Sequence, residues 1–145
     1  MKLNGINDQP NHVYRGMSNI EFEQALERGY LQSDNRYSPY EHQTGGVTCF
    51  GDLKTAHEYA KDIPIGSPED IHTDYRSDRP REKPYEGVIL EVPRSLVKDH
   101  TQDHRVHTGE YWSFDPIPVE KFTRAWIYTP EVDGNKISFS EKQII

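Results

Sequence analysis

Apolar residues recur along the chain in short runs, which are separated by polar stretches rich in proline and glycine. The run from Gly87 to Val92 is the strongest strand candidate, because aliphatic and β-branched residues dominate it and Pro93, which has no N–H to donate, closes it. We expect this strand to lie in the centre of a sheet. A shorter apolar pair, Val13 and Tyr14, predicts another strand that ends at Gly16.

A helix is predicted directly after this first strand. Ser18-Asn19-Ile20-Glu21 has the form of a capping box, in which the serine hydroxyl accepts from the third helical N–H and the glutamate reaches back to the cap. Gly29 stands where a residue in the left-handed conformation would end the helix. The apolar stripe expected to face the core consists of Ile20, Phe22, Ala25 and Leu26.

A further strand and a second helix are predicted after a turn-rich loop at 31–46. Residues 47–50 have the composition of a strand, and Asp52 is in position to cap the helix. Leu53, Ala56 and Ala60 would fall on one face of that helix. The next segment, 62–86, holds four prolines among many charges, so we expect a long mobile loop or a substrate-facing insertion without a packed element.

The C-terminal part contains three more strand candidates, at 111–114, 122–128 and 137–139. Asp133-Gly134-Asn135 has the chemistry of a tight turn and predicts a terminal hairpin. Two early helices followed by several strands indicate an α+β fold. A length of 145 residues is typical of one domain, so we expect a single domain over residues 1–145.

Composition limits the partners and the cellular compartment that we expect for the protein. The formal net charge of −7 disfavours broad capture of nucleic-acid phosphates. Cys49 is the sole cysteine, so an internal disulfide is impossible and a reducing compartment is favoured. No apolar run approaches the length of about 18 residues that a membrane span needs, and the N-terminus lacks a secretory pattern. We expect a cytoplasmic monomer without a membrane partner.

Three sequence blocks, in this order, resemble the ADP-ribosyltransferase family. The first is His12-Val13-Tyr14-Arg15-Gly16, and the second is Gly46-Val47-Thr48-Cys49-Phe50 with Ala56 and Tyr59-Ala60 behind it. The third is Gly109-Glu110-Tyr111-Trp112. The resemblance covers roughly residues 12 to 130 and implies split antiparallel sheets with NAD in the cleft between them.

The resemblance implies catalytic and nucleotide-binding roles for residues of these blocks. Arg15 and Gly16 would contact NAD, since a guanidinium offers fixed, permanently charged donors to a pyrophosphate or ribose. Thr48 would position the ribose or the glutamate. Glu110 matches the catalytic glutamate, whose carboxylate would stabilise the positive charge that develops on the ribose. The simpler alternatives are a surface ion pair for Arg15 and a core strand for Thr48 and Cys49.

Two further groups of residues invite a binding role. Tyr37 and Tyr40 are candidates to stack on nicotinamide or adenine, although such tyrosines more often cover the edge of a core. His100, His104 and His107 have the chemistry of metal ligands. Similar spacings also arise in solvated polar loops, so we expect no metal site.

The sequence therefore predicts a mono-ADP-ribosyltransferase that uses NAD and transfers ADP-ribose to a protein, nucleic-acid or small-molecule acceptor. Many family members that modify protein side chains carry Glu or Gln two residues before the catalytic glutamate. This chain has Thr108 there, so arginine-directed transfer is not implied. Two alternatives stay open: an RNA 2′-phosphotransferase, which would need several basic phosphate-binding residues, and a catalytically degenerate NAD-cleft protein that serves as a binding module or inhibitor.

Overall fold

The computed structural model of the chain describes residues 2–3, 5–32, 48–62, 65–74, 79–99 and 110–145. The helical elements in these residues are α1 (Asn19–Arg28), α2 (Leu53–His57), the π-helical turn η2 (Glu58–Asp62) and the 3₁₀ turns η3 (Pro68–His72), η4 (Arg94–Leu96) and η5 (Val119–Lys121). The strands are β1 (Lys2–Leu3), β2 (Ile6–Asn7), β3 (His12–Ser18), β4 (Tyr30–Leu31), β5 (Thr48–Phe50), β6 (Thr73–Asp74), β7 (Arg79–Pro80), β8 (Gly87–Pro93), β9 (Lys98–Asp99), β10 (Tyr111–Ser113), β11 (Ile117–Pro118), β12 (Arg124–Asp133) and β13 (Lys136–Gln143).

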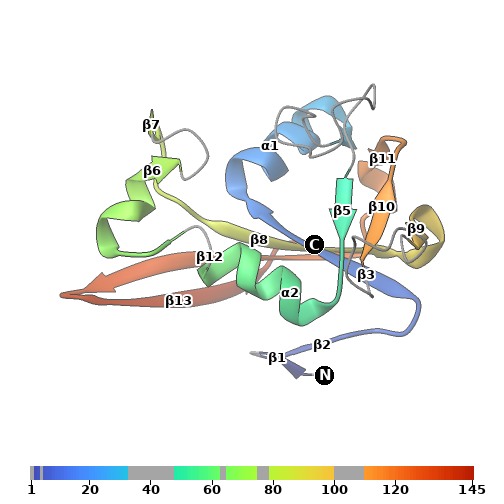
Figure 1. Cartoon of the computed structure of the whole chain (residues 1–145). Helices are drawn as coiled ribbons and strands as arrows, with labels where there is room; N and C mark the ends of the chain where they lie inside the picture. Colours follow the sequence, from blue (N-terminus) through green and yellow to red (C-terminus); the bar gives the residue numbers. More distant parts are fainter. Residues whose placement is uncertain (1, 4, 33–47, 63–64, 75–78, 100–109) are drawn as a thin grey trace.

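A four-stranded antiparallel sheet runs through the molecule in the order β13-β12-β8-β3 (Figure 1). Strand β8 lies between β12 and β3 and is buried from Gly87 to Val92, so the prediction of a central strand is confirmed. The predicted terminal hairpin is confirmed as well. It joins β12 to β13 through a turn at Gly134 and Asn135, and Gly134 has a φ of 60°.

Each face of this sheet packs against different elements. On one face, Phe50 of β5 and Ile117 of β11 join Val13, Val88 and Leu90 of the sheet in one hydrophobic core. Strands β5 and β11 belong to smaller antiparallel sheets, of order β5-β10-β9 and β11-β4. The opposite face carries α2. The antiparallel sheets and short helices fit the predicted α+β class, and no helix of the described residues is long and apolar enough to cross a membrane.

Helix α1 begins and ends where the sequence predicts. Ser18 is the N-cap, with its side chain accepting from the N–H of Glu21, and Gly29 ends the helix at a φ of 87°. The stripe differs by one position, because Phe22 and Ala25 are buried whereas Leu26 is exposed. In a helix of about 3.6 residues per turn, Leu26 lies roughly 100° around from Ala25, which turns it away from the core.

Helix α2 and turn η2 lie directly on the backbone of the large sheet. Asp52 caps α2 by accepting from the N–H of Thr55, and the predicted face is buried. Two glycines make this close approach possible: a Cβ at Gly16 would overlap the carbonyl oxygen of Ala56, and one at Gly87 would overlap that of Ala60. Positions 16 and 87 of β3 and β8 therefore need residues without a side chain.

The segment 62–86 differs from the loop that the sequence predicts. Its described residues include η3 and the short β6–β7 hairpin, and Tyr85 is buried. The Tyr85 hydroxyl donates to the carbonyl oxygen of Ala60 at 2.6 Å, while the guanidinium of Arg81 lies 4.7 Å from the centre of its ring. One aromatic residue thus anchors a segment that is otherwise too polar to pack, an outcome that composition alone does not reveal.

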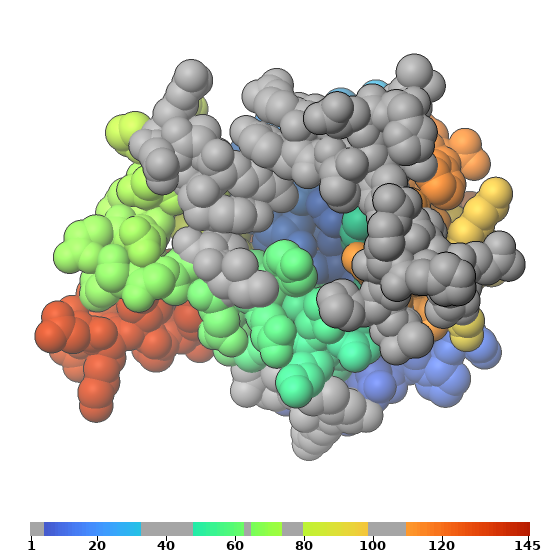
Figure 2. Space-filling model, in the orientation of Figure 1, coloured from blue at the N-terminus to red at the C-terminus, as the bar shows by residue number. Residues whose placement is uncertain are grey.

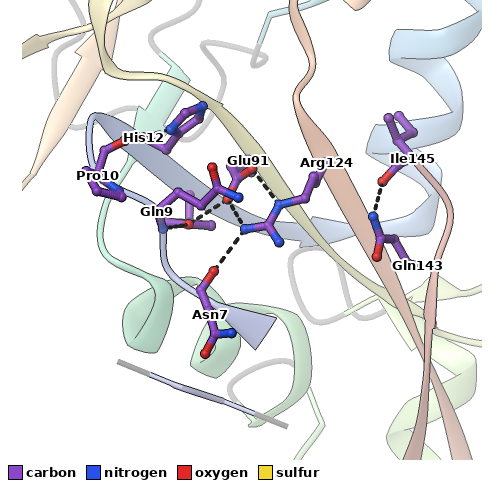
Figure 3. A network of polar contacts seen from close by, with 9 residues as sticks. Asn7, Gln9, Pro10, His12, Glu91, Arg124, Gln143 and Ile145 are labelled. Carbon is purple, nitrogen blue, oxygen red and sulfur yellow. Dashed lines mark hydrogen bonds and ion pairs between the residues drawn. The ribbon is translucent and has the colours of Figure 1, made fainter. Parts of the chain in front are cut away.

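The large sheet holds a buried carboxylate, that of Glu91 on β8. Arg124 donates to both of its oxygens, at 2.8 and 2.6 Å, and the Tyr14 hydroxyl donates to it at 2.6 Å. Figure 3 shows Arg124 reaching on to the carbonyl oxygen of Asn7, at 2.9 Å. Burial and the bond to Glu91 raise the pKa of Tyr14 to about 12.

The packing of η2 on the sheet predicts that Gly87→Ala destabilises the protein. The added methyl group has no space beside Ala60, and overpacking of this kind costs about 1–3 kcal/mol. Urea unfolding followed by circular dichroism measures the loss. Gly66→Ala is the matched control, because its Cβ would meet only the end of the Asp70 side chain, and equal stability of the two variants would contradict the prediction.

Candidate functional site

A backbone bridge joins the four-stranded sheet to the three-stranded sheet β5-β10-β9, and the two sheets part beyond it. Tyr14 of β3 and Gly51, directly after β5, form an isolated antiparallel bridge in which each N–H donates to the other's carbonyl oxygen, at 2.9 and 2.8 Å. Continuing that register would place Gly16 opposite Cys49. The described residues show no bridge there, so the edges of β3 and β5 part after Tyr14.

This separation leaves backbone groups of β3 facing the gap. Because the N–H and C=O of Tyr14 point toward Gly51, the alternation of an antiparallel strand turns those of Gly16, two residues later, to the same edge. No backbone group among the described residues hydrogen-bonds to Gly16 across that edge. Figure 2 shows a recess on this face, with the N-terminal chain (blue) as its floor and the segment around α2 (green) as its lower rim.

Arg15 spans the gap beside Gly16. Its Nη1 donates to the carbonyl oxygen of Cys49 at 3.0 Å, and its Nη2 lies 2.6 Å from Oε1 of Glu21 in the first turn of α1. The side chains of Arg15 and Glu21 are only 12% and 16% exposed. The guanidinium thus links β3 to both α1 and β5, and Glu21 is a partner that the sequence reasoning did not anticipate.

Glu110, from the third sequence block, lies just before the strand that pairs with β5. It immediately precedes β10, whose Tyr111 and Trp112 pair with Phe50 and Cys49 of β5. The charge of its carboxylate raises the pKa of the Cys49 thiol, as does that of Glu21, whereas the charge of Arg15 lowers it. Arg15 and Glu110, which are 95 positions apart in the sequence numbering, therefore both act on Cys49.

The other predicted site residues lie in different surroundings. Thr48 is fully buried and, since side chains alternate along a strand, points with Phe50 away from Cys49. Gly16 has a packing role against Ala56 besides its edge-facing backbone. Tyr37 and Tyr40 lie outside the described residues, and the roles of all four in binding or catalysis stay predictions.

Metal binding finds no support in the part of the chain that the structure describes. No group of three or more His, Cys, Asp or Glu side chains there is arranged to hold an ion. The candidates His100, His104 and His107 fall outside the described residues. The expectation of no metal site stays a prediction.

One exposed aromatic residue near the gap carries no assigned role in the sequence prediction. Tyr59 of η2 is 49% exposed, and its Cβ lies against the position that a Cβ of Gly16 would occupy. The helical pattern of the sequence already indicates this exposure. Tyr59 directly precedes Ala60, which is buried, and neighbouring residues of a helix point in different directions. Tyr59 is therefore an exposed aromatic residue whose Cβ lies next to Gly16.

The thiol of Cys49 is held in its neutral form. Burial raises its pKa, the charge of Arg15 lowers it, and the carboxylates of Glu110 and Glu21 raise it. A thiol with a raised pKa is a poor nucleophile at neutral pH. Cys49 is thus better described as a reporter of the charges around it than as a reactive group.

A small pocket lies on the other side of the Tyr14–Gly51 bridge. It has a volume of about 150 Å³ and is lined by Asp8, Gln9, His12, Val13, Tyr14, Gly51, Asp52, Leu53 and Tyr111. Sites for ligands of ordinary size occupy about 300–1,000 Å³. This pocket is too small for a dinucleotide, so the gap at Gly16 is the better candidate.

Comparison with known proteins gives a fold but no function. No protein-family model and no curated protein matches the chain. Among solved structures it is similar to the crystal structure of protein CC0527 from Caulobacter crescentus, a structural genomics target. The TM-score is 0.53 and the sequence identity is 16%, over 86% of this chain and 91% of that chain. At this identity the likeness concerns the fold alone, so function must be argued from the site.

The charges around Cys49 predict slow alkylation of its thiol. The rate with iodoacetamide in the folded protein should be low at pH 7 and rise with a midpoint above the ordinary thiol pKa, because burial disfavours the thiolate. The pH dependence of labelling measures the midpoint, and the chain has no other cysteine to interfere. The same protein unfolded in urea is the control, and a lower midpoint in the folded state would contradict the prediction.

Proposed function

We propose that the protein is an NAD-dependent mono-ADP-ribosyltransferase, with an ADP-ribosyltransferase-like split of its sheets forming the NAD cleft. The observation that carries the proposal is the convergence of residues from all three sequence blocks. Arg15 and Gly16 from β3, Cys49 from β5 and Glu110 before β10 surround the point where the two sheets separate. We further propose that it works as a cytoplasmic monomer.

The open edge at Gly16 suits the carboxamide of nicotinamide. A carboxamide carries one carbonyl acceptor and an NH₂ donor on the same planar group, so it complements an N–H and a C=O that face one edge. Tyr59 adds an aromatic ring next to Gly16, and a flat cationic ring gains energy from an aromatic face. The excess of carboxylates over guanidinium among Arg15, Glu21 and Glu110 favours a cationic ring as well.

Glu110 supplies the electrostatic part of the proposed reaction. The bond between ribose C1′ and the nicotinamide nitrogen breaks, its electron pair leaves with nicotinamide, and positive charge develops on C1′ and the ring oxygen. A carboxylate fixed beside the ribose stabilises that charge more strongly than it stabilises the ground state. The nucleophile of the acceptor then bonds to C1′, and its proton passes to solvent. The acceptor is a macromolecule or a small molecule.

Arg15 and Thr48 take supporting roles in this proposal. Arg15 bounds the cleft and contacts the nucleotide at the edge of β3, where two of its nitrogens are already held by Glu21 and Cys49. Thr48 acts from within the second sheet, opposite Ser113 of β10, and keeps the strand that carries Cys49 in register with the residues after Glu110.

The RNA 2′-phosphotransferase alternative is weakened by the same contacts. Such an enzyme needs uncompensated positive charge for phosphate, whereas Glu21 offsets the charge of Arg15 at 2.6 Å. The other alternative, a degenerate NAD-binding module or inhibitor, would use the same residues for binding. An assay of nicotinamide release from NAD distinguishes the two functions, because only the enzyme would release nicotinamide.

Glu110→Ala should abolish nicotinamide release and ADP-ribose transfer while NAD affinity changes little. The carboxylate acts mainly on charge that exists only in the transition state, and loss of such a stabiliser typically lowers the rate about 10²- to 10³-fold. Nicotinamide release is measured by chromatography and NAD binding by calorimetry. Glu120→Ala is the control, because Glu120 is an exposed glutamate of η5, and equal turnover of both variants would exclude Glu110 as the catalytic residue.

Arg15→Ala should weaken both NAD binding and turnover, and Arg15→Lys should restore little. A lysine carries the charge but lacks the planar fork that reaches Cys49 and Glu21 together. Calorimetry and steady-state kinetics on the two variants measure the effects. Full activity of Arg15→Lys would show that only charge matters, and unchanged behaviour of both variants would remove Arg15 from the site.

A further inference from the structure

The ion pair between Arg15 and Glu21 is unlike an ordinary surface pair. Its closest N–O distance is 2.6 Å, and its side chains are 12% and 16% exposed. On the same helix, Glu23 pairs with Lys83 at 3.3 Å, with side chains 48% and 66% exposed. Exposed pairs of the second kind contribute little, whereas removing one partner of a largely buried pair leaves a charge with poor solvation.

The backbone fixes the place of the Glu21 carboxylate. Ser18 accepts from the N–H of Glu21 at 3.2 Å, and the N–H of Asn19 donates to the carbonyl oxygen of Glu86, next to β8, at 2.8 Å. The first turn of α1 is therefore tied both to its own cap and to the central strand. A carboxylate on this turn is a rigid support for a partner on β3.

We propose that Glu21 is a positioning residue of the candidate site, which holds the Arg15 guanidinium across the gap so that one nitrogen meets α1 and the other meets the edge of β5. This role rests on the proposed function, because it matters to the reaction only if the gap binds NAD. In this arrangement Glu21 does not touch the substrate. It acts through Arg15, which it keeps on the carbonyl oxygen of Cys49.

The thiol of Cys49 gives a test that needs no enzymatic activity. Among the described residues, three charges act on this thiol. Arg15 lowers its pKa, Glu110 and Glu21 raise it, and the effect of Arg15 is the largest of the three. If Glu21 acted only through its own charge, Glu21→Ala would lower the thiol pKa. If Glu21 holds Arg15 in place, Glu21→Ala releases the guanidinium and the thiol pKa rises.

The measurement is the pH dependence of iodoacetamide labelling of the full chain, whose single cysteine gives an unambiguous signal. We expect a higher labelling midpoint in Glu21→Ala than in the parent protein, and an unchanged midpoint in Glu23→Ala, the matched control on the same helix. Glu21→Leu, which preserves the volume without an acceptor, serves if the alanine variant does not fold. A midpoint that falls or stays constant in the Glu21 variants would overturn the proposal.

A double-mutant cycle tests the same role in the reaction. Glu21→Ala should lower kcat/KM for nicotinamide release about tenfold, and the Arg15→Ala/Glu21→Ala double variant should be no worse than Arg15→Ala alone, because contacting residues that act as a unit are not additive. Additive losses would overturn the positioning role. If the parent protein releases no nicotinamide, the proposed function fails, and the labelling experiment still decides whether Glu21 positions Arg15.

Discussion

The buried carboxylate of Glu91 is the constraint on which the arrangement of the sheets depends. It lies on the central strand β8 and has no exposed surface, so its charge requires partners inside the protein. Arg124 of β12 and Tyr14 of β3 supply them, and Arg124 also holds the carbonyl oxygen of Asn7. A single charge thereby joins the three neighbouring strands and the N-terminal segment, and the loss of either partner would leave that charge under-solvated.

Tyr14 connects this buried cluster to the candidate site. Its hydroxyl donates to Glu91, while its N–H and C=O form the isolated bridge to Gly51 that joins the second sheet to the first. The next two residues face other directions: Arg15 reaches toward α1 and β5, and Gly16 turns its backbone groups to the gap. Tyr14 thus joins the two sheets at the near end of the gap.

Much of the fold follows from local rules in the sequence, and the contacts of the site do not. Ser18 and Gly29 mark the ends of α1 through cap chemistry, and the buried run of β8 reveals a central strand without any knowledge of its neighbours. The partner of Glu21 depends instead on where β3 passes α1, and the need for Gly16 depends on the approach of Ala56, 40 positions later in the numbering. Such contacts are set by tertiary packing, which residue spacing does not encode. The same holds for Tyr85, whose hydrogen bond to Ala60 anchors a segment of unfavourable composition.

The charge balance among Arg15, Glu21 and Glu110 is the ground on which we prefer one of the chemistries proposed for the site. Glu21 offsets the charge of Arg15, which leaves the carboxylate of Glu110 as the excess charge near Cys49 among the described residues. A site with excess negative charge opposes the binding of a phosphate as the reacting group but favours a reaction in which positive charge grows on a sugar carbon. The neutral thiol of Cys49 is consistent with that requirement, since a thiolate at the same place would compete with the acceptor for the electrophilic carbon. On these grounds the glutamate, rather than the arginine or the cysteine, is the group on which the proposed chemistry depends.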